Sequence, residues 1–208
     1  MLNELLKRYP ALEVCREEIV AAKDAWIRCY ENGGKLMACG NGGSCADSEH
    51  IVGELMKGFL KKRPLSAEQI AGMKQNNPEL DPACLEKLQG GLPAIALPGL
   101  GALNSAFCND VDPDLVYAQP LMGLGCPGDV LVCISTSGNS RNVVAAAQVA
   151  KALGLTVVGM TGKAGGALKK IADICICVPE TETFKVQELH LPVYHYLCAE
   201  TEARFFKN

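Results

Sequence analysis

Short apolar runs separated by helical segments constrain the fold of this chain more than any other feature. Five runs are of strand length, and they cover 35–39, 93–97, 129–135, 156–160 and 173–178. Each run is apolar along its length and does not alternate, which is typical of strands buried on both faces of a parallel sheet. We therefore predict an α/β three-layer sandwich with a central parallel sheet of about five strands.

Two further segments complete the predicted organisation. Residues 2–31 carry an apolar stripe that predicts a long N-terminal helix, which Pro10 interrupts early. The polar, turn-rich segment 61–91 predicts a helical insertion of one or two short helices, with capping-box spacing from Ser66 to Gln69. This insertion is a surface excursion, a lid or an oligomer contact. The length of 208 residues suits one domain over 1–208.

Charge and cysteine usage exclude several classes of protein. The net charge is -3 without a long block of one sign, so we expect neither nucleic acid nor an anionic membrane as a partner. The first residues show no signal-peptide pattern, and no apolar run approaches the ~20 residues of a membrane span. Eleven scattered cysteines without a CxxC pair favour free thiols over a disulfide or zinc-finger framework. We therefore expect a cytoplasmic protein.

The turn Gly40-Asn41-Gly42-Gly43-Ser44 follows the first predicted strand and opens a helix. Glycines allow backbone N–H groups to converge on an anion, which the positive end of the helix attracts. We expect Ser44 to be the N-cap residue. The turn matches neither a P-loop nor the full dinucleotide fingerprint, so by itself it indicates a ligand site without naming the ligand.

A second polar turn, at 135–140, follows the third predicted strand. Its hydroxyls, from Ser135, Thr136, Ser137 and Ser140, can donate several hydrogen bonds to a phosphate without adding charge. Ligands of open parallel sheets bind beyond the carboxyl ends of the strands. Binding of a phosphorylated small molecule therefore explains two such turns better than ordinary helix capping does. A third loop, 161–166, is ambiguous.

The histidines raise a separate question. His50 and Glu54 are four residues apart on the helix that the first turn opens, so they share one face. Spacing alone makes such a pair more often a surface contact than a site. His190 and His195 differ by roughly 140° on a second predicted helix, so they do not both face one site comfortably. Spacing does not choose between these two.

Three stretches, CGNGGSCADSEHIVGEL, ISTSGNS and VQELHLPVYH, resemble the sugar isomerase (SIS) domain proteins, and within them the phosphoheptose isomerases. The similarity runs over nearly the whole chain, with 61–91 as an extra-long segment that the usual member lacks. The resemblance implies a flavodoxin-like SIS fold and a homotetramer with active sites shared between subunits. It also implies conversion of sedoheptulose 7-phosphate to D-glycero-D-manno-heptose 7-phosphate through an enediol.

The resemblance also implies roles for particular residues. It places Zn2+ at His50, Glu54, Gln187 and His195, with Glu54 and His195 as the acid–base pair and the order of their action open. His195 is then the site histidine, and His190 is structural. The implied contacts to the sugar phosphate are Asn41, Gly42, Gly43, Ser44, Asn109, Asp110, Ser135, Thr136, Ser137, Ser140 and Gln187.

One position departs from the family pattern. Phe184 stands where an acid usually precedes the glutamine by three residues, and Glu182 is nearby but does not match that position. Two alternatives to the phosphoheptose isomerase stay open, namely an isomerase of another sugar phosphate and a non-catalytic SIS protein that binds a phosphosugar or a partner protein. Non-catalytic members as a group lack the helix glutamate and the late histidine. Both are present here, which favours an enzyme.

Overall fold

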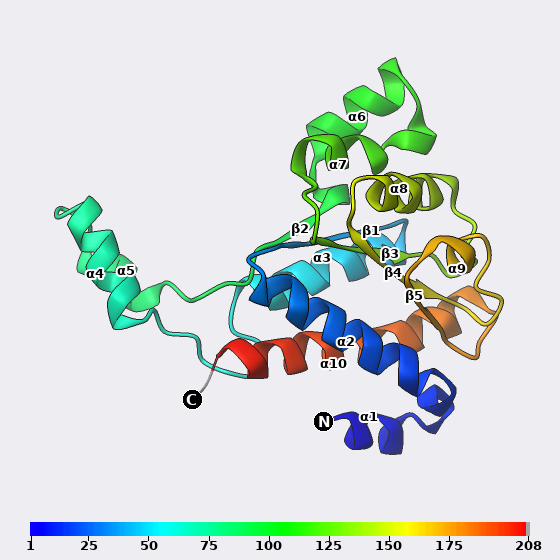
Figure 1. Ribbon diagram of the computed structural model, residues 1–208, viewed down its shortest axis with the longest axis horizontal. Helices are drawn as coiled ribbons and strands as arrows, with labels where there is room; N and C mark the ends of the chain where they lie inside the picture. Colours follow the sequence, from blue (N-terminus) through cyan, green and yellow to red (C-terminus); the bar gives the residue numbers. More distant parts are fainter. Residues whose placement is uncertain (207–208) are drawn as a thin grey trace.

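Five parallel strands form one central sheet. The computed structural model describes residues 1–206, so the last two positions of the predicted domain 1–208 lie outside the described residues. The strands follow the order β2-β1-β3-β4-β5 across the sheet (Figure 1). Their bounds are Leu36–Gly40 for β1, Ala94–Ala96 for β2, Val130–Ile134 for β3, Thr156–Thr161 for β4 and Ile174–Cys177 for β5. The predicted parallel α/β fold is confirmed, and each strand ends within one residue of its predicted run.

Helices cover both faces of the sheet, which explains why the strands are apolar throughout. In β1, Leu36 and Ala38 pack into one layer, whereas Met37 and Cys39 pack into the other. The first layer contains α2 (Arg16–Glu31), α3 (Gly43–Met56) and α10 (Thr183–Phe205). The second contains α7 (Ala118–Leu124), α8 (Arg141–Ala152) and α9 (Leu168–Ile171). The three-layer sandwich therefore forms as predicted.

The N-terminal helix is interrupted where Pro10 predicts it. α1 (Leu2–Arg8) ends before a 3-10 segment over Pro10–Cys15, and α2 then continues the chain. Proline has no N–H to donate and its ring crowds the preceding turn, which favours a break in the helix at this point. Shorter elements are α6 (Gly101–Asp110) and 3-10 turns at Leu97–Gly99 and Pro113–Leu115. Within residues 1–206, no helix is long and apolar enough to span a membrane.

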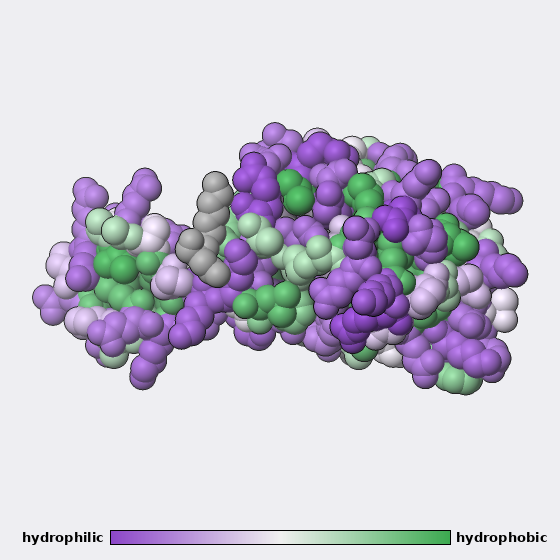
Figure 2. Space-filling view, turned by 90° about the horizontal axis from the view of Figure 1, so that it is seen from below, coloured by the Kyte–Doolittle hydropathy of each residue, from purple (hydrophilic) through white to green (hydrophobic). Residues whose placement is uncertain are grey.

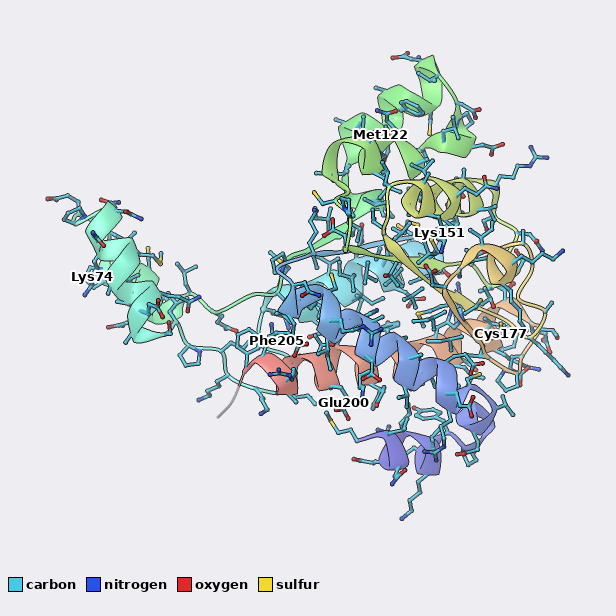
Figure 3. The ribbon with its side chains drawn as sticks, in the orientation of Figure 1. Lys74, Met122, Lys151, Cys177, Glu200 and Phe205 are labelled. Carbon is cyan, nitrogen blue, oxygen red and sulfur yellow. The ribbon has the colours of Figure 1, made fainter. Side chains whose placement is uncertain are left out.

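The insertion folds as a helical hairpin of α4 (Ala67–Asn76) and α5 (Pro82–Lys87). The predicted capping box is present, because Gln69 N–H donates to Ser66 Oγ at 3.1 Å and Ser66 N–H donates to Gln69 Oε1 at 2.9 Å. The hairpin, which carries Lys74 in Figure 3, projects from the end of the molecule opposite to the carboxyl ends of the strands. Figure 2 shows it as a separate lobe with apolar side chains among hydrophilic ones. It is therefore not a lid over the carboxyl edge of its own subunit.

A buried ion pair anchors the root of this hairpin. Arg63 Nε lies 2.8 Å from Glu202 Oε1, and both side chains are at most 1% exposed. The Arg63 guanidinium also donates to the carbonyls of Glu54 and Leu55 at the end of α3. Such a pair is stable inside a protein only when its remaining donors and acceptors are satisfied. Arg63 therefore ties the hairpin to both α3 and α10.

Backbone N–H groups complete the surroundings of Glu202. Those of Phe59, Leu60 and Lys61 donate to its carboxylate at 2.8, 2.8 and 3.1 Å. Burial alone would raise the pKa of Glu202, but the N–H groups of Phe59 and Leu60 and the nearby guanidinium hold that pKa below its usual value. The carboxylate is therefore charged at neutral pH.

We predict that Glu202→Gln lowers the free energy of unfolding by about 3–5 kcal/mol, because it leaves the Arg63 charge buried without a counter-charge. Urea denaturation followed by circular dichroism measures this loss. The control is Glu200→Gln, because Glu200 pairs with the N-terminal amine at a partly exposed position and its loss costs at most about 1 kcal/mol. Equal losses in the two variants would contradict the assigned role of the buried pair.

Candidate active site

The two predicted turns meet at the carboxyl edge of the sheet. β2 lies on one side of β1, whereas β3, β4 and β5 lie on the other, so the chain reverses its direction of winding between β1 and β3. Open parallel sheets bind their ligands at such a switch point. Asn41 and Asn142 bridge the two turns here, since each side-chain amide donates to the other at 2.9 and 3.0 Å.

The first turn begins α3 differently from the prediction. Gly42 is the N-cap residue and has a φ of +56°, a conformation that glycine adopts without strain. Ser44 is inside the helix and 3% exposed, and its N–H donates to the Asn41 carbonyl at 3.0 Å. The prediction of Ser44 as the N-cap is therefore wrong. A Cβ at Gly40 would lie 2.5 Å from the Ser44 carbonyl oxygen, so glycine allows α3 to start directly against the strand.

The second turn is held in shape by its own hydroxyls. Ser135 and Ser140 join their Oγ atoms at 3.0 Å, and Asn139 N–H donates to Ser137 Oγ at 3.1 Å. Ser137 is exposed, whereas Ser135 is almost completely buried at the end of β3. The turn therefore presents one hydroxyl openly and uses others to fix its backbone.

The third loop, 161–166, supports the second turn. Gly162 N–H donates to the Thr136 carbonyl at 2.9 Å. Gly138 has a φ of +68°, and a Cβ there would collide with the carbonyl of Gly165. Close backbone contact of this kind requires glycine. Loop 161–166 therefore supports the second turn, which we predict to bind phosphate.

Two residues at this edge were missed by the sequence reasoning. Asn142 lies in the first turn of α8, just after the second turn. A polar residue at the start of a helix beside a predicted site is a signal that could have identified Asn142. The Tyr117 hydroxyl shares its one hydrogen between two acceptors, the Gly40 carbonyl at 2.9 Å and Asn41 Oδ1 at 3.1 Å. Tyr117 lies 76 residues from Asn41 along the chain, and no local pattern links the two.

α3 and α10 lie side by side and run in the same direction away from this edge. Gln187, near the start of α10, reaches the start of α3, because a Cβ at Gly43 would lie 2.5 Å from its Nε2. Farther along, Tyr194 O–H donates to Asp47 Oδ1 at 3.1 Å. In Figure 3, Cys177 marks the carboxyl end of β5, and Phe205 marks the far end of α10 near the root of the hairpin.

A cluster of titratable groups lies between the two helices. His50 Nε2 is 3.1 Å from Glu54 Oε1, and Lys57 Nζ is 3.1 Å from Glu54 Oε2. The His195 ring packs edge-on against His50, with 5.0 Å between ring centroids. His195 Nε2 is buried without a hydrogen-bond partner among residues 1–206. Burial, and then His50, lower the pKa of His195, while Glu54 opposes them.

The remaining predicted residues lie apart from this cluster. Asn109 and Asp110 are exposed at the end of α6, where Asn109 Nδ2 donates to Asp110 Oδ1 at 2.8 Å. In the described part of the chain, neither makes a hydrogen bond to the two turns. Phe184 is 56% exposed in the first turn of α10, and Glu182 pairs with Lys185. The acidic side chain of the family pattern is therefore absent at position 184.

Comparisons with known proteins agree with this geometry. An SIS domain family model matches residues 2–96 and 87–162. The phosphoheptose isomerase of Methylibium petroleiphilum is 38% identical over 191 residues, which is 90% of this chain and 82% of that protein. The phosphoheptose isomerase of Roseiflexus sp. is 36% identical over 190 residues, or 91% and 83%. The chain belongs to the SIS-domain phosphoheptose isomerase family.

Solved structures of this SIS family share the fold. The phosphoheptose isomerase from Neisseria gonorrhoeae superposes with a TM-score of 0.76 at 31% identity, covering 97% of this chain and 94% of that one. The phosphoheptose isomerase from Francisella tularensis gives the same TM-score at 30% identity, covering 93% and 90%. The resemblance to the family is therefore confirmed over nearly the whole chain.

The side chains of the titratable cluster between α3 and α10 are of types that bind zinc, although they are not arranged as a closed metal site. Two imidazoles and a carboxylate converge, and the unpartnered Nε2 of His195 is a free ligand atom. Within residues 1–206, no three His, Cys, Asp or Glu side chains are grouped closely enough to hold a metal. Zinc binding therefore needs side-chain movement or the amide of Gln187.

His190 has a structural role, as predicted. Its ring is buried, and Nε2 lies 3.2 Å from the Thr161 carbonyl, to which it donates. Burial lowers the pKa of His190 to about 4. The unfolded chain therefore binds one more proton than the folded chain between pH ~6.5 and ~4, and stability falls as the pH falls through this range.

We predict that this histidine contributes a slope of about 1.4 kcal/mol per pH unit to the free energy of unfolding in that range. Urea denaturation at several pH values measures the slope. His190→Gln should remove it, because glutamine does not titrate and its amide can still donate to the Thr161 carbonyl. Identical slopes in the variant and the unaltered protein would contradict the prediction.

Proposed function

We propose that this protein is an aldose–ketose isomerase that converts sedoheptulose 7-phosphate to D-glycero-D-manno-heptose 7-phosphate. The observation that carries the proposal is the arrangement on α3, which has an anion-binding turn at its start and an acid–base cluster farther along. The turn suits the phosphate, and the cluster suits the carbons at the other end of the sugar. The names of the relatives in the same family support this substrate.

The length of the site favours a long sugar. Gly43 and His50 are seven residues apart on α3, a rise of about 10 Å. The Glu54 side chain leans back toward the helix start and meets His50, so its carboxylate lies near the same level. An extended seven-carbon phosphate spans about 10 Å, at ~1.2 Å of length per bond, and a five-carbon one is shorter by about a quarter. The span therefore favours a heptose phosphate.

Two residues carry the proton transfers. Glu54 removes the proton from C1 of the ketose, beside the C2 carbonyl, and returns it to C2, so that an enediol lies between the two steps. His195 moves the other proton from the C1 hydroxyl to the C2 oxygen, which leaves an aldehyde at C1. Burial and the neighbouring His50 lower the pKa of His195, which favours the neutral ring that this exchange requires.

We also propose Zn2+ at His50, Glu54, Gln187 and His195. When bound, the ion supplies a Lewis acid that polarises the carbonyl oxygen and stabilises negative charge on the enediol. The two histidines and the glutamate lie together between α3 and α10, and Gln187 extends the donor set toward the turn that begins α3.

A homotetramer with shared sites explains why Asn109 and Asp110 lie apart from the titratable cluster. Both residues are exposed on α6, none of whose residues is buried, so they are available to complete the site of a neighbouring subunit. We place the enzyme in the cytoplasm, because all eleven cysteines, which lie within the described residues, are free.

Deuterium exchange tests the reaction. Proton NMR of sedoheptulose 7-phosphate in deuterated water, with zinc, should show deuterium incorporation and new aldoheptose signals. Glu54→Gln should lower the exchange rate about 10²–10⁴-fold, because amides do not accept the proton, while the sugar phosphate still raises the melting temperature. The control is Glu49→Gln, an exposed glutamate on the same helix, which should keep full activity.

Two outcomes would contradict the proposal. Retained turnover in Glu54→Gln removes Glu54 from the mechanism. If the unaltered protein gives no turnover but its melting temperature still rises with sugar phosphate, the protein binds phosphosugars without isomerising this one. A panel of five-, six- and seven-carbon ketose phosphates then separates another isomerase from a binding protein.

Metal removal tests the zinc proposal. Chelation should abolish isomerisation and leave the far-ultraviolet circular dichroism unchanged, because α3 and α10 pack through their own apolar side chains. Added Zn2+ should restore the activity. Full activity in metal-free protein would show that the ion is not part of the mechanism.

A further inference from the structure

A chain of hydrogen bonds leads from a half-buried carboxylate to the proposed metal site. Tyr194 O–H donates to Asp47 Oδ1 at 3.1 Å, and the same hydroxyl oxygen lies 3.0 Å from His50 Nδ1. His50 Nε2 in turn lies 3.1 Å from Glu54 Oε1. Asp47 Oδ2 is buried without a partner among residues 1–206, so Tyr194 is the side-chain donor on which this carboxylate depends.

The number of hydrogens on each group determines which group donates in each of these hydrogen bonds. An ionised carboxylate only accepts, so the single hydrogen of Tyr194 points to Asp47. The hydroxyl oxygen then accepts from His50, which must carry its hydrogen on Nδ1. Nε2 is then the nitrogen that faces Glu54, whose carboxylate also only accepts, so the hydrogen bond of 3.1 Å between them holds a proton that a metal ion can replace.

We propose that Tyr194 and Asp47 are positioning residues that hold a hydrogen on Nδ1 of His50, so that Nε2 is the nitrogen that binds a metal ion opposite Glu54. This inference rests on the proposed function, because it explains how one residue of that site is prepared for its ion. Partners of this kind orient metal-binding histidines and fix their tautomer. A proton on Asp47 would reverse both bonds of the Tyr194 hydroxyl and leave His50 with a hydrogen on Nε2 alone.

The tautomer can be read directly. The chain has three histidines, so long-range 1H–15N spectra of protein labelled at histidine contain few signals. His190 is an internal reference, because its Nε2–H donates to the Thr161 carbonyl. We expect His50 of the metal-free protein to carry a hydrogen on Nδ1 at neutral pH.

Matched variants test the two positioning residues. Tyr194→Phe removes only the hydroxyl, so Nδ1 of His50 loses its acceptor and should lose its hydrogen, whereas Nε2 keeps the hydrogen that Glu54 accepts. Asp47→Asn should have the same effect to a smaller extent, because its amide can still accept from the hydroxyl. Tyr196→Phe is the control, since Tyr196 is on the same helix and its hydroxyl makes no hydrogen bond within the described residues.

Zinc titration without sugar gives a second readout. Tyr194→Phe should weaken the binding of Zn2+ about 10–100-fold, whereas Tyr196→Phe should leave it unchanged. A purely structural role would lower the melting temperature without changing the tautomer.

Two results would overturn the proposal, namely an Nδ1 of His50 without a hydrogen in the unaltered protein, and an unchanged Nδ1 signal and zinc affinity in Tyr194→Phe. Neither measurement uses the isomerase reaction. A protein with the expected tautomer and no isomerase activity would therefore refute only the proposed function.

Discussion

Because all five strands run in one direction, the turns after β1 and β3 open at the same edge of the sheet, and α3 begins at that edge. α10 also starts there after β5, so the two helices leave the edge in parallel. This shared direction places the turn that begins α3 and the titratable cluster along the same pair of helices. An antiparallel arrangement would have separated them, since successive turns would lie at opposite edges.

Packing between α3 and α10 then determines which side chains meet. Gln187 lies at the start of α3, Tyr194 and His195 lie beside His50, and Glu202 closes the far end with Arg63. Apolar side chains of both helices, among them Ile51, Leu55, Val193 and Leu197, pack in one layer beside these polar contacts. The buried pair at the hairpin root also fixes the end of α3, close to Glu54, so the insertion and the candidate site share one support.

Local patterns predicted the parts that depend on local physics. The apolar runs gave all five strands, Pro10 gave the break in the first helix, and Ser66 with Gln69 gave the capping box. The N-cap of α3 was predicted wrongly, because serine is the commoner cap residue and the close approach of the helix to Gly40 is not visible in sequence. The role of Tyr117 was missed for a similar reason, since its contacts cross 76 and 77 residues.

The sequence by itself determined the parallel sheet, the two polar turns and the shared face of His50 and Glu54, because periodicity and backbone conformation are local properties. Tertiary structure decided which late histidine lies beside His50. Spacing left His190 and His195 open, and the rotation of α10 against α3 buries the first under Thr161 and turns the second toward the cluster. Tertiary structure also placed Asn109 and Asp110 at the exposed end of α6, because the position of α6 follows from packing and not from any pattern within it.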